Sequence, residues 1–201
     1  MDRDGNILIE LDESTILRHL LILENYEIQS VAIGYLHAFV NPIHEIRTRE
    51  VLAKARPDLS ISLACEVAPE IREFERLSTA CANAYVRPLM ASYLARLAEE
   101  LKTEGFLCPF LLMTSGGGLT TLDTATRFPI RLVESGPAGG AILAQRISEH
   151  LGLDRMLSFD MGGTTAKLCL IDDGKPLTSR SFEVDRVYRF KKGSGLPVRI
   201  P

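Results

Sequence analysis

Short apolar runs alternate with stretches of helical periodicity along most of this chain. Compact or alternating apolar runs, which are typical of strands, lie at residues 7–11, 30–36, 59–64, 109–113, 130–133, 155–159 and 166–171. Between them, helices are predicted at residues 13–26, 42–55 and 74–101, and from the segment 134–140 to residue 150. This alternation predicts an α/β fold, and an antiparallel hairpin in the last third makes the expected sheet a mixed one.

Individual residues mark the ends of these elements. Asp12 supplies a capping oxygen for the first helix, and Pro42 opens the second because proline is tolerated in the first helical turn. Within the long helix, Pro88 should produce a kink or a break. The apolar residues of this helix recur at helical spacing and predict a core-facing stripe, which consists of Leu77, Tyr85, Leu89, Tyr93, Leu94, Leu97 and Leu101. The sequence Asp-Asp-Gly at 172–174 predicts a hairpin turn.

Composition restricts the class of protein. The chain has 201 residues, of which 46% are hydrophobic and 24% charged, so it can bury a core. A net charge of -3 with scattered Lys and Arg residues argues against a nucleic-acid partner. Apolar runs such as 31–36 and 106–113 are shorter than the roughly 20 residues that span a bilayer, and the start MDRDG lacks a leader pattern. We therefore expect a soluble, cytoplasmic protein without a membrane association.

The four cysteines lie far apart in the sequence, at Cys65, Cys81, Cys108 and Cys169. They lack the paired spacing of a zinc site or a redox motif. We interpret them as reduced, buried thiols.

The strongest chemical motif is LSFDMGGTTAKLCLIDDG at 157–174. A carboxylate at the end of a buried strand, Asp160, can hold a hydrated magnesium ion. Gly162 and Gly163 allow backbone N–H groups to approach phosphate oxygens, and Thr164 and Thr165 add hydroxyl donors. The order strand, glycine turn, strand differs from a Walker loop and from a dinucleotide-binding turn. The alternative is that these residues form an ordinary hairpin turn.

A second glycine-rich motif, ESGPAGGAILA at 134–144, lies at the start of a predicted helix. Free backbone N–H groups and a partial positive charge at a helix N-terminus suit an anion. The candidate residues are Ser135, Gly136, Gly139 and Gly140. The alternative is that the glycines only allow close packing of the helix.

In this order, the two motifs resemble the ATPase superfamily of actin, sugar kinases and heat-shock chaperones, in which a small-residue helix called connect-1 precedes a second phosphate loop of the form Asp-x-Gly-Gly-Thr. The resemblance becomes more specific upstream. The segments HAFVNPIHEIRTRE (37–50), SLACEVAPEIREFERLSTACANAYVRPLMASYL (62–94) and MTSGGGLTT (113–121), followed by ESGPAGG, are similar to those of the hydantoinase A / 5-oxoprolinase family, N-methylhydantoinase included. Motifs of this kind extend from about residue 31 to residue 174.

The resemblance implies an actin-like (ribonuclease H-like) ATPase fold and an enzyme that uses ATP and Mg²⁺ to open a cyclic amide such as hydantoin or 5-oxoproline. Phosphorylation of the amide oxygen would make the carbon electrophilic. By resemblance, Asp160 positions magnesium, residues 162–165 contact phosphate, and residues 135–140 close the hinge between lobes. A hydantoinase B-type subunit or domain is the implied partner.

Full-length relatives carry a first Asp-x-Gly-Gly-Thr loop near the N-terminus, and this sequence has none. We therefore expect a partial hydantoinase A/oxoprolinase domain: a helix-rich α/β part (1–130), the connect-1 helix with the phosphate-loop hairpin (131–190), and an end without a sealing strand (191–201). Two alternatives are the ATP-using subunit of an acetone- or acetophenone-type carboxylase and a catalytically silent module.

Other residues invite chemical interpretations. Lys167 stands where many relatives have an aspartate, and it could contact phosphate or be solvated, the latter being favoured. His37, His44 and Glu45 could bind a metal, but Asn41-Pro42 followed by His-Glu also starts a helix, and we favour the helix start. Ser115 lacks the frame of a hydrolase nucleophile and is interpreted as part of a backbone turn near substrate or nucleotide. A charge cluster at 70–76 is interpreted as a solvated, mutually paired face.

Overall fold

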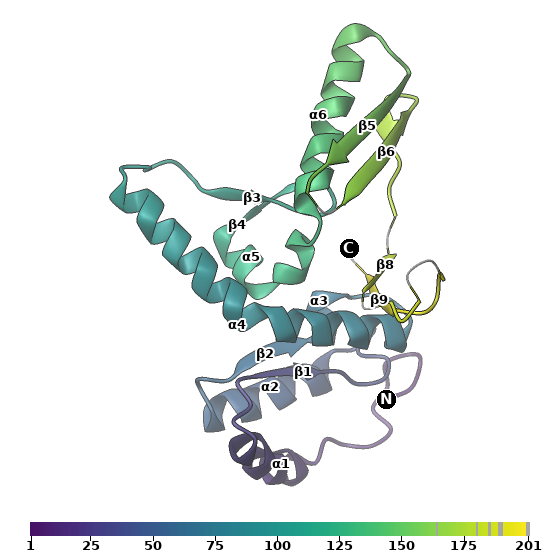
Figure 1. Cartoon of the computed structure of the whole chain (residues 1–201). Coiled ribbons are helices and arrows are strands. Elements are labelled where there is room, and N and C mark those ends of the chain that lie inside the picture. Colours follow the sequence, from purple (N-terminus) through teal and green to yellow (C-terminus); the bar gives the residue numbers. More distant parts are fainter. Residues whose placement is uncertain (164, 180, 185, 189–190, 200–201) are drawn as a thin grey trace.

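The computed structural model describes residues 1–163, 165–179, 181–184, 186–188 and 191–199. In its N-terminal half, two short parallel strands, β1 (Ser30–Ile33) and β2 (Ser60–Leu63), form the inner layer. Helix α4 (Glu73–Thr103) covers one side of this pair, and α2 (Ile43–Ala55) with α1 (Glu13–Asn25) covers the other (Figure 1). A core cluster between these layers contains Ile33, Leu52, Leu59 and Leu63.

The ends of the N-terminal helices follow the sequence rules closely. Asp12 caps α1, since its carboxylate accepts hydrogen bonds from the backbone N–H groups of Ser14 (2.9 Å) and Thr15 (3.4 Å). Pro42 directly precedes the first residue of α2, and the Asn41 side chain accepts from the Ile43 N–H at 3.2 Å. Both predicted helix starts are therefore confirmed.

Helix α4 is continuous over 31 residues despite Pro88, and its ribbon changes direction part-way along (Figure 1). The predicted core-facing stripe of this helix is wrong at Tyr85, Leu89 and Tyr93, which are 86%, 75% and 48% exposed, whereas Leu94 is buried as predicted. The other buried residues of the helix are Arg76, Thr79, Ala80, Asn83 and Ala84. This face of α4 packs against α3 (Ala64–Val67), the short helices after α4 and the last strand.

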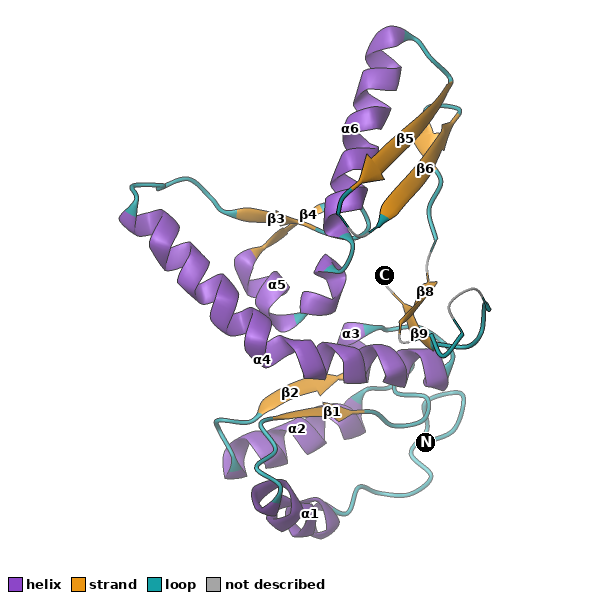
Figure 2. Ribbon diagram, viewed as in Figure 1, coloured by secondary structure: helices purple, strands orange, loops and turns teal. Residues whose placement is uncertain are grey.

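The C-terminal half consists of small antiparallel units. Strands β3 (Leu111–Met113) and β4 (Leu119–Thr121) form a hairpin that leads into α5 (Leu122–Arg127) and the 3₁₀ helix η1 (Pro129–Leu132). Helix α6 (Ser135–Leu151) then packs against β5 (Arg155–Met161), β6 (Ala166–Asp172) and β7 (Lys175–Pro176). Strands β8 (Ser181–Val184) and β9 (Leu196–Arg199) return to α4, while α6 and the β5–β6 hairpin extend away from it (Figure 2).

The α/β class is confirmed, but the strands do not join into one sheet in the described part of the chain. They form a parallel pair, β1-β2, and three separate antiparallel units, β3-β4, β5-β6-β7 and β8-β9. On the face of the β5–β6 hairpin turned away from α6, Leu157, Phe159 and Leu168 are 54–65% exposed. No helix among the described residues has the length and apolarity to cross a membrane.

Two of the predicted strands are wrong. Residues 7–11 form no strand, because Leu8 and Ile9 find no partner strand and stay 68% and 80% exposed. Residues 130–133 contribute to a 3₁₀ helix, since Pro129 opens it and the Ile130 N–H donates to Asn83 Oδ1 at 3.3 Å.

The end of the chain also differs from expectation. We expected no sealing strand at 191–201, yet β9 pairs with β8 and Val198 is fully buried in the core. The Arg199 N–H donates to Thr79 Oγ1 at 2.9 Å, which fixes this strand on α4. The cysteines are free thiols, as expected. Burial was predicted for all four, but Cys81 and Cys108 are exposed, and Cys65 and Cys169 are half-buried. None of them is among the buried residues of the two core clusters.

Candidate functional site

The β5–β6 hairpin has the geometry that the Asp-Met-Gly-Gly-Thr motif predicts. The two strands are antiparallel neighbours with Asp160 opposite Lys167, and the Gly162 N–H donates to the Thr165 carbonyl at 3.1 Å. Strand β5 continues to Met161, so Asp160 lies inside the strand rather than directly after it. Asp160, Gly162, Gly163 and Thr165 are all exposed, and Thr164 lies outside the described residues.

The second motif forms the first turns of α6. Glu134 precedes the helix in the left-handed region (φ 63°) and provides no side-chain cap, so the N–H groups of Ser135 and Gly136 receive no cap from its side chain, while Pro137 has no N–H to offer. Ser135 and Gly139 are half-buried, whereas Gly136 and Gly140 are exposed. A Cβ at Gly136 or Gly140 would meet no described atom within 4 Å, so packing within this part of the chain does not require glycine there.

An ion pair joins the two motifs. The Lys167 ammonium contacts the Glu134 carboxylate, which places the N-terminus of α6 beside the hairpin. Lys167 and Asp160 share one face of the hairpin, because residues paired directly across antiparallel strands point to the same side. The expectation of a solvated Lys167 is therefore wrong, since this side chain is half-buried and paired. Sequence reasoning also missed Glu134, which lies 33 positions away in the sequence.

A third glycine loop, residues 114–118 between β3 and β4, packs against the same helix. The Ser115 N–H and hydroxyl donate to the Arg131 carbonyl at 2.8 and 2.7 Å, and the hydroxyl also contacts the Val133 carbonyl. Gly117 has φ +81°, and a Cβ there would lie 3.0 Å from the Ile142 side chain. Ser115 therefore belongs to a backbone turn, as predicted, and its hydroxyl fixes that turn to the segment preceding α6.

The segment around His44 and Glu45 is structural. Glu45 is completely buried, and its two oxygens accept hydrogen bonds from the backbone N–H groups of Tyr35 (3.1 Å) and Cys65 (2.8 Å). His44 packs edge-on against Tyr35. Burial first, and then the Glu45 carboxylate, raises the pKa of the Cys65 thiol to about 12, so this cysteine stays protonated near neutral pH. These contacts agree with the helix-start interpretation.

The charge cluster at 70–76 is mutually paired, as predicted, but it is not a solvated face. Arg76 is completely buried and contacts Glu45 (3.4 Å) and Glu73 (3.5 Å), and it donates to the Tyr35 carbonyl at 2.7 Å. Glu70 pairs with Arg199 of the last strand. The prediction of a solvated face failed because Arg76 lies on the buried side of α4, where it is the partner of Glu45.

The site is thus a region of an α/β protein in which a glycine-turn hairpin and a second glycine loop meet the uncapped N-terminus of one helix. Residues 76–201 match the family described as Hydantoinase/oxoprolinase, and residues 1–56 match the Hydantoinase/oxoprolinase N-terminal region. The chain belongs to the hydantoinase/oxoprolinase family.

Individual relatives support this membership. The chain is 38% identical to an uncharacterised protein of Methanocaldococcus jannaschii, over 100% of this chain and 30% of that protein. It is 31% identical to the caprolactamase subunit alpha of Pseudomonas jessenii, over 92% of this chain and 27% of that protein. The chain therefore spans less than a third of the length of these relatives.

Two solved structures share the fold. The ATP-dependent caprolactamase of Pseudomonas jessenii superposes with a TM-score of 0.79 at 29% identity, covering 98% of this chain and 28% of that chain. A nucleotide-free acetone carboxylase, from a study of ATP-dependent acetone carboxylation, superposes with a TM-score of 0.77 at 26% identity, covering 87% of this chain and 25% of that chain.

Proposed function

We propose that this chain contributes one phosphate-binding half of the nucleotide site in an enzyme that opens a cyclic amide at the expense of ATP. The observation that carries the proposal is the hairpin with exposed Asp160, Gly162 and Gly163 beside the uncapped N-terminus of α6. Backbone N–H groups at a glycine turn and at a helix N-terminus are suited to phosphate oxygens. The named relatives that depend on ATP support the same assignment.

The proposed reaction transfers the γ-phosphoryl group of ATP to the amide oxygen and releases ADP. Water then adds to the activated carbon and the ring C–N bond breaks, which leaves an acyl phosphate on the opened chain. A second water molecule hydrolyses the acyl phosphate, so that the products are an open-chain amino or ureido acid, ADP and phosphate. Activation is required because amide resonance makes the carbonyl carbon a weak electrophile. Gly162, Gly163, Thr164 and Thr165 would contact the phosphates, and residues 135–140 would line the hinge between the lobes of an actin-like fold.

Asp160 fits the role of a magnesium ligand. Its carboxylate lies exposed in the strand that leads into the turn, and Gly162 and Gly163 have open space around them. Mg²⁺ prefers carboxylate oxygens and retained water molecules. When bound, the ion would neutralise charge on the phosphate oxygens. Lys167, held by Glu134, would supply a positive charge on the same face of the hairpin.

The proposed domain organisation keeps residues 1–130 as the helix-rich α/β part and 131–190 as the connect-1 helix with the phosphate-loop hairpin. A second subunit or domain of the hydantoinase B type is the proposed partner. The relative named caprolactamase subunit alpha supports it, because an alpha subunit has at least one other subunit beside it.

The fold similarity to acetone carboxylase favours a second candidate function, the ATP-using subunit of a ketone carboxylase. The complete enzyme with Mg²⁺ and ATP can decide between them when it is offered 5-oxoproline, hydantoin or caprolactam, or acetone with bicarbonate. We expect phosphate release together with a ring-opened product detected by mass spectrometry. Phosphate release that responds to ketone and bicarbonate alone would assign the carboxylase function, and no ATP turnover with any substrate would indicate a silent module.

The 201-residue chain alone should bind ATP with a millimolar or weaker dissociation constant. Its phosphate turn is exposed, and each hydrogen bond made in open water contributes only about 0.5–1.5 kcal/mol, which the ordering costs of binding largely offset. Isothermal titration calorimetry with Mg²⁺ and ATP measures this affinity. A low-micromolar dissociation constant would show that the nucleotide site is already whole in this chain.

A further inference from the structure

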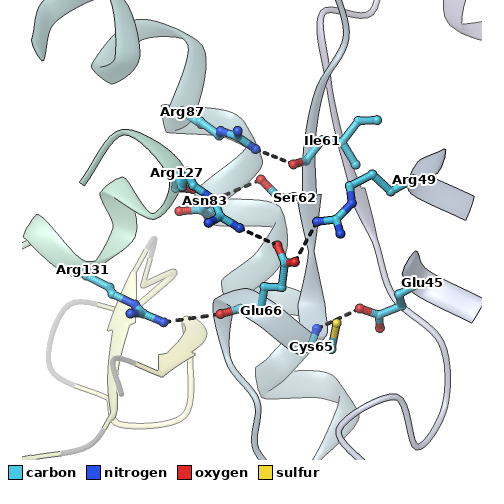
Figure 3. Close-up of polar contacts among 10 residues, drawn as sticks. All are labelled: Glu45, Arg49, Ile61, Ser62, Cys65, Glu66, Asn83, Arg87, Arg127 and Arg131. Carbon is cyan, nitrogen blue, oxygen red and sulfur yellow. Dashed lines mark hydrogen bonds and ion pairs between the residues drawn. The ribbon is translucent and has the colours of Figure 1, made fainter. Parts of the chain in front are cut away.

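Four arginines gather around a single carboxylate, far from the phosphate turn in the sequence. Glu66 of α3 lies between Arg49 of α2 and Arg127 at the end of α5, with N–O distances of 2.7 and 3.4 Å (Figure 3). Arg131 donates to the Glu66 backbone carbonyl at 3.3 Å, and Arg87 of α4 donates to the Ile61 carbonyl. Four separate segments of the chain, α2, α4, α5 and η1, therefore bring positive charge to one place.

The charges in this cluster do not balance. Within the described residues, neither Arg87 nor Arg131 forms an ion pair with a carboxylate, and Glu66 already serves both Arg49 and Arg127. Loss of hydration first, and then the nearby Arg127, lowers the pKa of Arg87. Burial lowers the pKa of Arg131, whose Nε atom is buried without a hydrogen-bond partner. A half-buried excess of positive charge is costly unless an anion compensates it.

A cavity of about 200 Å³ opens onto three of the four arginines, and Arg131 lies beside it without lining it. Arg49, Arg87, Arg127, Glu66 and Ser62 are among the residues that line it. Its volume is below the range of roughly 300–1,000 Å³ that is usual for drug-sized ligands, so it suits a small ion better than a nucleotide. No described residue of α6 or of the β5–β6 hairpin contributes to the lining.

The side chains that line the cavity offer more hydrogen-bond donors than acceptors. Each guanidinium has five N–H groups, and Arg49, Arg87 and Arg127 each donate one hydrogen bond to the described part of the chain. Ser62 is 3% exposed, and its hydroxyl oxygen accepts from the Asn83 side chain at 3.0 Å, which leaves the hydroxyl hydrogen free to turn toward a ligand.

We propose that this cavity is a binding site for a small tetrahedral oxyanion of the phosphate class, held by Arg87 and Arg127 with help from Arg49 and Ser62. Guanidinium groups match phosphate oxygens with paired, charge-assisted hydrogen bonds. A divalent anion also compensates the positive charge that Glu66 leaves unbalanced. This site is separate from the nucleotide site proposed above and does not depend on it, because its lining and its test involve neither the phosphate turn nor ATP.

Isothermal titration calorimetry of the 201-residue chain with inorganic phosphate at constant ionic strength tests the site. We expect saturable binding by the wild type and at least a tenfold weaker dissociation constant for Arg87→Gln. The matched control is Arg96→Gln, which removes an exposed arginine from the same helix and should leave the dissociation constant unchanged. Sulfate should compete with phosphate, whereas acetate should bind more weakly.

Several outcomes would overturn the proposal. The first is the absence of saturable phosphate binding by the folded wild type. The others are equal phosphate affinity in Arg87→Gln and wild type, and a loss of phosphate affinity in Arg96→Gln as large as that in Arg87→Gln. Tighter binding of acetate than of phosphate would assign the cavity to a carboxylate instead. If circular dichroism shows that Arg87→Gln does not fold, Arg127→Gln replaces it, because that side chain is 47% exposed and its replacement should be tolerated. Undiminished phosphate affinity in that variant would equally refute the site.

Discussion

Replacing Arg76 with methionine should lower the free energy of unfolding by about 3–5 kcal/mol, the usual cost of removing one partner from a buried ion pair. Arg76 and Glu45 are both completely buried, and their side chains lie 3.4 Å apart. Without the guanidinium, the Glu45 carboxylate would keep two backbone donors but no counter-charge, and the Tyr35 carbonyl would lose a 2.7 Å hydrogen bond. Urea unfolding followed by circular dichroism measures the change.

The control for this variant is Arg146→Met, which breaks an exposed pair between Arg146 and Glu149 on α6. An exposed pair is worth only about 0–1 kcal/mol, so this change should be several times smaller. If the loss in Arg76→Met does not exceed the loss in Arg146→Met, the buried pair does not hold α2 and α4 together. Glu45→Gln should also destabilise, because it leaves the Arg76 charge buried.

The parts of the fold that could be predicted from sequence are those governed by neighbouring residues. Asp12 predicts the start of α1 because its side chain caps the helix locally. The Asp-Asp-Gly turn at 172–174 joins β6 to β7, and Asp173 and Gly174 are both in the left-handed region. The strand, turn and strand of the β5–β6 hairpin follow equally local rules.

The parts that could not be predicted depend on distant partners. The apolar period of α4 suggested a stripe through Tyr85 and Leu89, but the buried face was decided by Glu45 and by the strand that contributes Val198. Residues 7–11 form a compact apolar run of strand length, yet a strand requires a hydrogen-bonding neighbour that this segment does not find.

The residues of the candidate site also divide into those that neighbouring residues predict and those that depend on distant partners. Asp160 and the glycines of the turn were recognisable because their spacing within a few residues carries the chemistry. The Lys167–Glu134 contact joins residues 33 positions apart, and the Glu66 carboxylate pairs with arginines from two helices, α2 and α5. No local sequence pattern predicts such contacts. For the Lys167–Glu134 contact, the two signals available were the unusual Lys167 and Glu134, the first residue of ESGPAGG.

In the complete enzyme, Asp160→Asn should reduce ATP-dependent ring opening by about a hundredfold or more while the fold stays intact. Loss of one group that orients charge at the transition state typically costs about 3–4 kcal/mol. Asn keeps the size of Asp160 and an acceptor oxygen but removes the negative charge that suits a divalent cation. Asp160 is exposed on the hairpin, so the substitution leaves no buried group without a partner.

The matched control is Asp173→Asn, the same substitution in the turn between β6 and β7 of the same sheet. Asp173 has φ 51°, a conformation that Asn adopts readily, so both turnover and the thermal unfolding midpoint should stay near wild type. Steady-state turnover at saturating Mg²⁺ and ATP, measured as ring-opened product, compares the two variants. If Asp160→Asn turns over as fast as Asp173→Asn, Asp160 does not serve the phosphoryl-transfer step, and the hairpin would have to act through its backbone N–H groups alone.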